Sequence, residues 1–464
     1  MALDPEIEQA IARRKQEYLD TLFKLLRQPS ISTQGVGVDE CAELVRAVLE
    51  ENGITGRIMP TAGLPVVYGE RLVGDDANTM LIYGHYDVQP PEPYEAWISP
   101  PFEPTIRDGR VYARGAGDNK GQFLAHILAV KLLSDLGRLP RVNLKFLLEG
   151  EEESSSPNLR PYVESNLDLL KADLLYAADG PKHPSERPTI FFGMRGNLKM
   201  ELEATGPNRD VHSGNFGGPV PNPIWKLVNL LGTMRFPDGR VTVEGFYDGV
   251  RAPSEYEREL VAHIPFDEQA VKEDLGIAEF DGPRELSYYE KLMFQPTLNP
   301  TGIAGGYCGK GAKSAIPSKA ILKLECRTVV DQDPDDIVAK IRRHVGRYAP
   351  DVSIRKLGGT WPSKTPLDLP VARMVVQAVA SATGVEPVVL PVLGGSSPNY
   401  LFTNVLNVPA IWSAYAPSDE NNHSPNESIT IEGFFDGIRC SASVIQQFAA
   451  MPREMARQRS PGGM

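Results

Sequence analysis

Histidine and carboxylate side chains that could bind a metal ion stand at the end of an early apolar run. Residues 80–88 are mostly apolar and include His85 and Asp87, one residue apart, and Asp118 follows in the glycine-rich segment 114–121. Imidazole and carboxylate together suit a borderline divalent ion such as zinc. Alternate residues of a strand share a face, so one side chain can bind metal while the other orients it. A surface His and Asp at a strand end would give the same short pattern.

Three later segments add further acids and a histidine. Residues 149–154 read Glu-Gly-Glu-Glu-Glu-Ser directly after an apolar run, and such consecutive acids are costly unless a cation meets them. Asp179 follows a run of small residues, and His423 lies in the polar segment 421–427. Taken singly, these are compatible with a solvated acidic loop, an Asp-Gly turn and a polar-loop histidine.

Composition bounds the class of protein. The chain has 464 residues, 41 % of them hydrophobic and 23 % charged, which predicts a globular protein of two or three domains. Its formal net charge of −12 argues against nucleic acid as a partner. No apolar run is long enough to span a membrane, and the acidic N-terminus lacks a signal-peptide core. Four scattered cysteines predict reduced side chains in a cytoplasmic protein.

Strand and helix patterns alternate in the first part of the chain, which predicts an α/β layered domain that positions these groups. The expected helices are residues 6–27, 39–52 and 121–136, and the expected strands are 56–59, 66–68, 80–83, 143–148 and 174–177.

The pattern changes near Gly196 and returns after residue 365. Between them we expect a strand, a helix beginning near Pro223, a long polar insert, a strand and a helix, at 197–204, 223 onward, roughly 235–295, 320–326 and 333–347. Later we expect a helix, a strand and a closing helix at 369–383, 409–412 and 431–449. We therefore predict a catalytic α/β domain with a mostly parallel sheet, formed by residues 1–196 and 366–464, and an inserted two-layer α+β lid and dimerisation domain, 197–365.

The order of the motifs is more specific than any one of them. It reads His-x-Asp, Gly-x-x-Asp-x-Lys-Gly, Glu-Glu-Ser, Asp-Gly and His-x-x-Asn-Glu. This order resembles the dinuclear metallopeptidases that include glutamate carboxypeptidase, aminoacylase, succinyl-diaminopimelate desuccinylase and the carnosine-type dipeptidases. The resemblance covers nearly the whole chain, including the insert motifs at 193–196, 210–214, 305–307 and 314–317.

The resemblance implies a set of metal ligands. His85, Asp118 and Asp179 would bind one ion, and Asp118, Glu153 and His423 would bind the second, with Asp118 bridging. Two divalent ions roughly 3.5–4 Å apart need a shared carboxylate to reduce their repulsion. We expect two ions per subunit, with zinc first and manganese or cobalt as alternatives, because nitrogen and oxygen ligands accept all three.

The resemblance also implies catalytic roles. Asp87 would fix the tautomer of His85, and a cis peptide bond would follow Asp118. Glu152 would be the general base, taking a proton from a water that bridges the metals and returning it to the leaving amine. The three consecutive glutamates leave the register open by one residue; Ser154, which follows the metal-binding glutamate in the dipeptidase branch, favours Glu152 as the base.

The remaining site residues belong to the insert and to a late glycine-rich loop. His212 resembles the histidine that reaches the partner subunit's active site and stabilises the oxyanion. Arg327 resembles the arginine that binds the substrate's terminal carboxylate, for which a bidentate guanidinium is suited. Ser396 resembles the loop residue that meets the same carboxylate. Closure of the two domains would exclude water and bring Arg327 over the metals.

Three functions are compatible with these motifs to different degrees. The first is a metal-dependent dipeptidase or related exopeptidase. The second is an N-acyl-amino-acid deacylase of the acetylornithine deacetylase or desuccinylase type, which uses the same catalytic set. The third, a catalytically inactive scaffold, would need a broken ligand set, whereas all five ligands and Glu152 are present. We expect a small peptide or N-acyl amino acid substrate, a cytoplasmic homodimer, and neither a nucleic acid nor a membrane partner.

Overall fold

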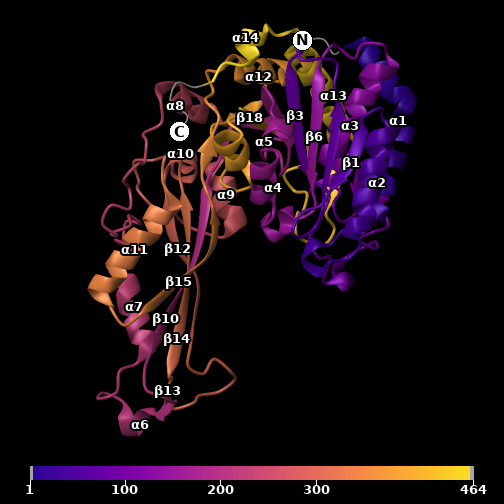
Figure 1. The fold of residues 1–464 in the computed structure, drawn as a ribbon. Coiled ribbons are helices and arrows are strands. Elements are labelled where there is room, and N and C mark those ends of the chain that lie inside the picture. Colours follow the sequence, from indigo (N-terminus) through magenta and orange to yellow (C-terminus); the bar gives the residue numbers. More distant parts are fainter. Residues whose placement is uncertain (1–3, 460–464) are drawn as a thin grey trace. The chain divides into compact units, whose positions relative to one another are not determined.

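The computed structural model describes residues 4–459 and divides into two compact units (Figure 1). Unit 1 comprises Met1–Gly193, Thr365–Pro391 and Ser397–Met464, and unit 2 comprises Met194–Lys364 and Val392–Ser396. The short segment Val392–Ser396 lies outside the insert boundaries expected from the sequence. It groups with unit 2 because Leu393 forms a bridge with Met194 and the Gly394 carbonyl accepts a hydrogen bond from Arg195 Nε at 2.9 Å.

Unit 1 is built on an eight-stranded sheet in the order β1-β2-β6-β3-β7-β18-β8-β17. The neighbours β6, β3, β7 and β18 are mutually parallel, as are β8 and β17, and the other pairs are antiparallel. A small antiparallel sheet, β19-β5-β4, accompanies it. The strands are β1 (Thr55–Met59), β2 (Val66–Arg71), β3 (Thr79–His85), β4 (Thr105–Arg107), β5 (Arg110–Tyr112), β6 (Asn143–Glu149), β7 (Leu174–Ala178), β8 (Thr189–Phe191), β17 (Val388–Leu390), β18 (Ala410–Ala414) and β19 (Ser428–Thr430).

Helices of unit 1 pack in a layer in the order α2, α1, α3, α13, α12 (Figure 1). Helix α3 is buried along almost its whole length, since it packs both on β3 and between α1 and α13. The helices are α1 (Pro5–Arg27), α2 (Val38–Glu51), α3 (Lys120–Asp135), α4 (Leu159–Ser165), α5 (Leu167–Leu170), α12 (Pro370–Thr383), α13 (Ile431–Ala450) and α14 (Arg453–Ala456). Three single-turn 3-10 helices are η1 (Ser32–Gln34), η2 (Tyr94–Ala96) and η3 (Glu152–Ser154), and η4 (Leu401–Val405) is a short π-helix.

The inner strands of this sheet explain the near-continuous apolar runs in the sequence. β6, β3 and β7 are buried on both faces, as expected for parallel strands covered by helices. The prediction of an α/β domain with a mostly parallel sheet is confirmed.

Unit 2 is a two-layer α+β domain. Its antiparallel sheet has the order β12-β14-β10-β15, and α7 and α11 cover one face, with the core between them (Figure 1). The strands are β9 (Gly193–Met194), β10 (Gly196–Thr205), β11 (Val211–His212), β12 (Thr297–Gly305), β13 (Ala315–Ile316), β14 (Lys319–Thr328), β15 (Ser353–Thr360) and β16 (Ser363–Lys364). The helices are α6 (Ser213–Phe216), α7 (Pro223–Gly232), α8 (Glu255–Ala262), α9 (Glu268–Leu275), α10 (Tyr288–Phe294) and α11 (Pro334–Tyr348).

One stretch of this unit has more regular structure than the sequence analysis assigned to it. The stretch 235–295, expected as a long polar insert, contains the three short helices α8, α9 and α10. Two of them begin with a capping box, in which a serine and a glutamate three residues later exchange hydrogen bonds: Ser254 with Glu257 and Ser287 with Glu290. Within residues 4–459, no helix has the length and apolar character needed to cross a bilayer.

Candidate metal centre

The five expected metal ligands lie in unit 1, close to strand ends. His85 is the last residue of β3, Asp179 directly follows β7, and Glu153 lies in η3, just after β6. These three strands are parallel neighbours, so their carboxyl ends meet at the same edge of the sheet. Asp118 comes from the loop before α3, and His423 from the loop between β18 and β19.

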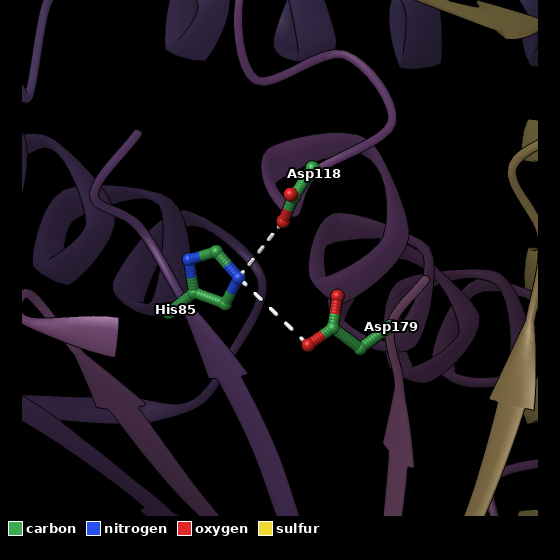
Figure 2. Close-up of side chains that lie close together, drawn as sticks. All are labelled: His85, Asp118 and Asp179. Carbon is green, nitrogen blue, oxygen red and sulfur yellow. Dashed lines mark ion pairs between the residues drawn. The ribbon is translucent and has the colours of Figure 1, made fainter. Parts of the chain in front are cut away.

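The ligands form two clusters that share Asp118. In the first, His85 Nε2 lies 3.1 Å from Asp118 Oδ1 and 3.9 Å from Asp179 Oδ2, and Figure 2 shows both carboxylates directed at the same ring nitrogen. In the second, His423 Nε2 lies 3.0 Å from Asp118 Oδ2 and 3.2 Å from Glu153 Oε2. Asp118 therefore offers one oxygen to each cluster, as a bridging carboxylate must.

The donor atoms in these clusters fit divalent cations. His85 Nδ1 lies 3.1 Å from the Asp87 carbonyl, which can only accept, so Nδ1 carries the proton and Nε2 offers a lone pair. Within residues 4–459, the buried Nε2 atom has no hydrogen-bond partner. A ring nitrogen that faces two carboxylates needs a positive charge beside it, and a bound divalent ion can supply that charge. The ligand atoms of each cluster lie within 4.8 Å of one another.

Buried acids around the clusters resist ionisation. Burial raises the pKa of Asp179 to about 6 and raises the pKa of Glu152 well above its ordinary value. Burial and the neighbouring Asp118 carboxylate also raise the pKa of Glu153. The ionised acids repel one another in a region of low dielectric constant, so a bound cation would favour the carboxylate forms that serve as ligands.

His423 and the shared carboxylate Asp118, by contrast, have pKa values that favour their charged forms. Hydrogen bonds to Asp118 and Glu153 raise the pKa of His423 to about 10. Burial opposes ionisation of Asp118, but the two histidine rings that face its carboxylate, His423 and His85, hold its pKa below the usual value. Asp118 is thus the carboxylate that stays ionised most readily.

The three consecutive glutamates have distinct surroundings. The Glu151 carboxylate accepts hydrogen bonds from the Leu64 N–H at 3.1 Å and from Asn158 Nδ2 at 2.9 Å, which makes it structural. Glu153 points to His423. In the part of the chain that the structure describes, the Glu152 carboxylate has no hydrogen-bond partner. Of the three, Glu152 is therefore the one free to exchange a proton with substrate or water, which supports the register chosen from Ser154.

Asp87 has a different arrangement from the expected one. Its carbonyl, rather than its carboxylate, is the nearer partner of His85 Nδ1, since Asp87 Oδ1 lies 3.5 Å away. The carboxylate instead accepts hydrogen bonds from the N–H groups of Glu152 at 3.2 Å and Glu153 at 3.1 Å. Asp87 therefore positions both the histidine and the turn that carries the two glutamates.

Asn119, to which the sequence analysis gave no role, connects three of the ligands. The peptide bond between Asp118 and Asn119 is cis, as the resemblance implied. Asn119 Nδ2 donates to the Ala178 carbonyl at 2.7 Å and to Asp179 Oδ1 at 3.1 Å, while its Oδ1 accepts from the His85 N–H at 3.3 Å. The residue ties the loop before α3 to the ends of β3 and β7.

Glu427 is a second positioning residue that the sequence analysis did not identify. Its buried carboxylate accepts hydrogen bonds from the N–H groups of Gly115, Gly117 and Asp118 at 3.1, 3.0 and 3.0 Å, and from Arg114 Nη1 at 2.7 Å. Gly115 allows this loop to turn because its φ of 85° is strained for other residues. Glu427 thereby fixes the backbone that presents the shared carboxylate.

Replacing Glu427 by Gln should weaken metal binding. One acceptor oxygen becomes an N–H donor that faces backbone N–H groups, so the loop and Asp118 must shift. We expect about 10- to 100-fold weaker zinc binding, the range found for residues that orient ligands. Competition with a chromophoric chelator measures it, with the exposed Glu43→Gln as the matched control. Zinc affinity equal to that of the wild type would show that the loop does not need this carboxylate.

The expected substrate-binding residues lie in unit 2. His212 is exposed at the end of β11, and its Nδ1 accepts a hydrogen bond from the Gly214 N–H at 3.0 Å. Arg327, on β14, donates from Nη1 to Ser396 Oγ at 2.9 Å. The structure therefore brings Arg327 and Ser396 together, while His212 lies on the two-stranded sheet β11-β13.

Comparisons with known proteins find metallopeptidases that are similar to this chain. The model of peptidase family M20/M25/M40 matches residues 81–447. The chain is 27 % identical to the Cys-Gly metallodipeptidase dug1 of Schizosaccharomyces pombe, over 97 % of this chain and 99 % of the relative. It is also 27 % identical to the Beta-Ala-His dipeptidase of Homo sapiens, over 97 % of this chain and 89 % of the relative.

Solved structures share the fold. The M20 family metallo-carboxypeptidase Sso-CP2 from Sulfolobus solfataricus matches with a TM-score of 0.87 and 36 % identity, over 94 % of this chain and 100 % of that one. Human carnosine dipeptidase 1 matches with a TM-score of 0.81 and 26 % identity, over 97 % of this chain and 100 % of that one. The matched residues of the family model, 81–447, include the positions of all five candidate ligands.

Proposed function

Since the chain belongs to peptidase family M20/M25/M40, we propose that it is a dinuclear metallodipeptidase that hydrolyses the amide bond of dipeptides or related short peptides. The observation that carries this proposal is the pair of ligand clusters sharing Asp118, with the unpartnered Glu152 carboxylate beside them. The dipeptidase names of the relatives favour this activity over N-acyl-amino-acid deacylation.

We assign the chain's own residues as follows. His85, Asp118 and Asp179 hold one divalent ion, and Asp118, Glu153 and His423 hold the other. When bound, the two ions supply Lewis acidity to the amide carbonyl and to the attacking water. Glu152 accepts the proton of that water and returns it to the leaving amine nitrogen. Burial raises the pKa of Glu152, which favours its protonated form once it has accepted that proton.

The residues of unit 2 complete the proposal. Arg327 and Ser396 bind the carboxylate of the C-terminal substrate residue, and their mutual hydrogen bond of 2.9 Å supports a common role. His212 stabilises the oxyanion that develops on the substrate in the active site of the partner subunit. A homodimer follows from that role, so light scattering at assay concentration should give twice the chain mass; the mass of one chain would contradict it.

A metallo-carboxypeptidase that removes C-terminal residues from longer peptides is the second candidate. The solved structure with 36 % identity to this chain bears that name. A carboxypeptidase and a dipeptidase share the catalytic residues. A dipeptidase requires a single residue before the scissile bond, whereas a carboxypeptidase accepts a longer or blocked peptide there.

A substrate panel separates these activities. The chain, reconstituted in turn with zinc, manganese and cobalt, is assayed against Cys-Gly, β-Ala-His, the N-acetylated forms of both dipeptides, tripeptides and N-acetyl amino acids. A dipeptidase turns over the free dipeptides fastest, whereas a carboxypeptidase prefers the blocked and longer peptides. Hydrolysis of N-acetyl amino acids alone would contradict both the dipeptidase and the carboxypeptidase activity. The metal that gives the highest activity shows whether zinc is preferred over manganese and cobalt.

We also propose a cytoplasmic location. None of the four cysteines forms a disulfide: three are buried (Cys41, Cys326 and Cys440) and Cys308 is exposed. Free thiols of this kind persist in a reducing compartment. Fractionation of the source cells should recover the enzyme with cytoplasmic markers, and recovery from the culture medium would contradict this.

A further inference from the structure

Two arginines of unit 2 are joined through one serine. Arg327 Nη1 donates to Ser396 Oγ at 2.9 Å, and Ser396 Oγ donates to the Arg195 carbonyl at 2.6 Å. The Arg195 guanidinium is held by its Nε, which donates to the Gly394 carbonyl at 2.9 Å. Both guanidinium groups therefore bind the same short loop, Arg195 through the Gly394 carbonyl and Arg327 through the Ser396 hydroxyl. The sequence analysis gave a role only to Arg327.

The positive charge beside this loop is not balanced. Arg327 Nε pairs with Glu325 Oε1 at 2.7 Å. Arg195 is only 8 % exposed, yet no carboxylate in residues 4–459 lies within ion-pair distance of it. Burial and the neighbouring Arg327 lower the pKa of Arg195 to about 10, so the group is still a cation near neutral pH. Two cations face one anion, and the unmatched charge is that of Arg195.

Unpartnered polar atoms lie beside Arg327 on the sheet. In the strand register, Arg327 pairs with Asn197 of β10 on one side and with Thr297 of β12 on the other, so the three side chains share a face. In the part of the chain that the structure describes, the buried atoms Asn197 Oδ1 and Thr297 Oγ1 have no hydrogen-bond partner. Such atoms are normally satisfied, so they indicate a place where a polar ligand binds.

A ligand that balances the charge of Arg195 and satisfies Asn197 and Thr297 is an anion that also forms hydrogen bonds. A hydroxyl such as that of Thr297 can donate to a carboxylate oxygen, and an amide oxygen such as that of Asn197 can accept from an N–H group. The C-terminal residue of a peptide carries both a carboxylate and an N–H group. One carboxylate would also balance the excess charge of the two arginines and Glu325.

We propose that Arg195 is a substrate-binding residue that holds the terminal carboxylate of the peptide together with Arg327, an inference that rests on the proposed exopeptidase function. Glu325 neutralises much of the Arg327 charge, so Arg195 supplies the net positive charge of the site. The requirement for a free C-terminal carboxylate then depends on Arg195.

The test compares a dipeptide with its C-terminal amide. For the best dipeptide of the panel, Arg195→Gln should lower kcat/KM about 10- to 100-fold, mainly through KM, as expected for loss of a charge-assisted hydrogen bond. Turnover of the amide should change by less than about two-fold, because its neutral C-terminal group forms no charge-assisted hydrogen bond with Arg195 in the wild type. Arg355→Gln, which removes an exposed arginine of the same unit, is the matched control and should leave both substrates unaffected.

Binding without turnover separates this inference from the proposed function. Calorimetry with a dipeptide analogue whose amide is reduced to CH2–NH, as the free acid and as the carboxamide, needs no hydrolysis. Arg195→Gln should lower the preference for the acid about 10- to 100-fold, since only Arg327 remains to bind the carboxylate. Arg195→Lys, which keeps the charge but not the planar fork, should lower it less. If either variant keeps the wild-type ratio of acid to amide affinity, or if both affinities fall equally, Arg195 does not bind the carboxylate, whether or not the wild type hydrolyses dipeptides.

Discussion

Replacing Glu152 by Gln should lower kcat for dipeptide hydrolysis by about 10²- to 10⁴-fold, the usual contribution of a positioned general base. Glutamine keeps the size of the side chain but cannot accept the proton. The Glu152 side chain forms no hydrogen bond with a residue of either ligand cluster. The variant should therefore still bind two metal ions per chain. Steady-state kinetics and plasma emission analysis of metal content measure the two effects separately.

Glu151→Gln is the matched control for this prediction. The Glu151 carboxylate is engaged with Leu64 and Asn158, and glutamine retains an acceptor oxygen for those bonds. We expect kcat within a few-fold of the wild type. If Glu151→Gln abolished turnover while Glu152→Gln remained active, the register of the glutamates would be shifted by one residue and the proposed base would be wrong.

Replacing Asp118 by Asn should remove metal from both clusters. Asp118 places one oxygen 3.1 Å from His85 Nε2 and the other 3.0 Å from His423 Nε2, whereas asparagine offers one neutral oxygen. A neutral amide cannot offset the repulsion between two divalent ions. We expect both metal ions to bind more weakly and a loss of activity greater than the roughly 100-fold typical of residues that only orient ligands.

Asp179→Asn provides the comparison, because Asp179 belongs to one cluster only. It should weaken one metal site and leave the other near wild-type affinity, as measured by zinc titration with a chelating indicator. An Asp118→Asn variant that lost one ion, or none, while Asp179→Asn lost both would show that Asp118 is not the shared ligand.

The strands that carry the ligands could be predicted from the sequence because each of them is a compact apolar run. β3, β6 and β7 were all expected within a few residues of their bounds. Their order in the sheet could not be read from the runs, since β3 lies between β6 and β7 although it precedes both in the chain. Only the family resemblance placed their polar ends in one site.

The positioning residues depend on contacts that no local pattern records. Glu427 and the loop 115–118 are about three hundred residues apart, so a glutamate near the end of the chain gives no local sign that it holds that loop. Asn119 was visible beside Asp118, but its hydrogen bonds to two other strands were not. The unsatisfied charge of Arg195 likewise emerges only when its neighbours in space are known.

The starts of two helices in the stretch 235–295 could have been predicted from the sequence. Helices α8 and α10 each begin with Ser-x-x-Glu, a pattern that predicts a helix start from the sequence alone. The polar composition of the stretch obscured this signal, because short surface helices bury few side chains.

A crystal structure of the zinc-loaded enzyme, with anomalous diffraction at the zinc absorption edge, shows whether the chain binds two metal ions through a shared carboxylate. We predict two anomalous peaks roughly 3.5–4 Å apart. Asp118 should lie between them, with His85 and Asp179 on one ion and Glu153 and His423 on the other. A single peak, or two peaks that do not share Asp118, would contradict a dinuclear centre of this kind.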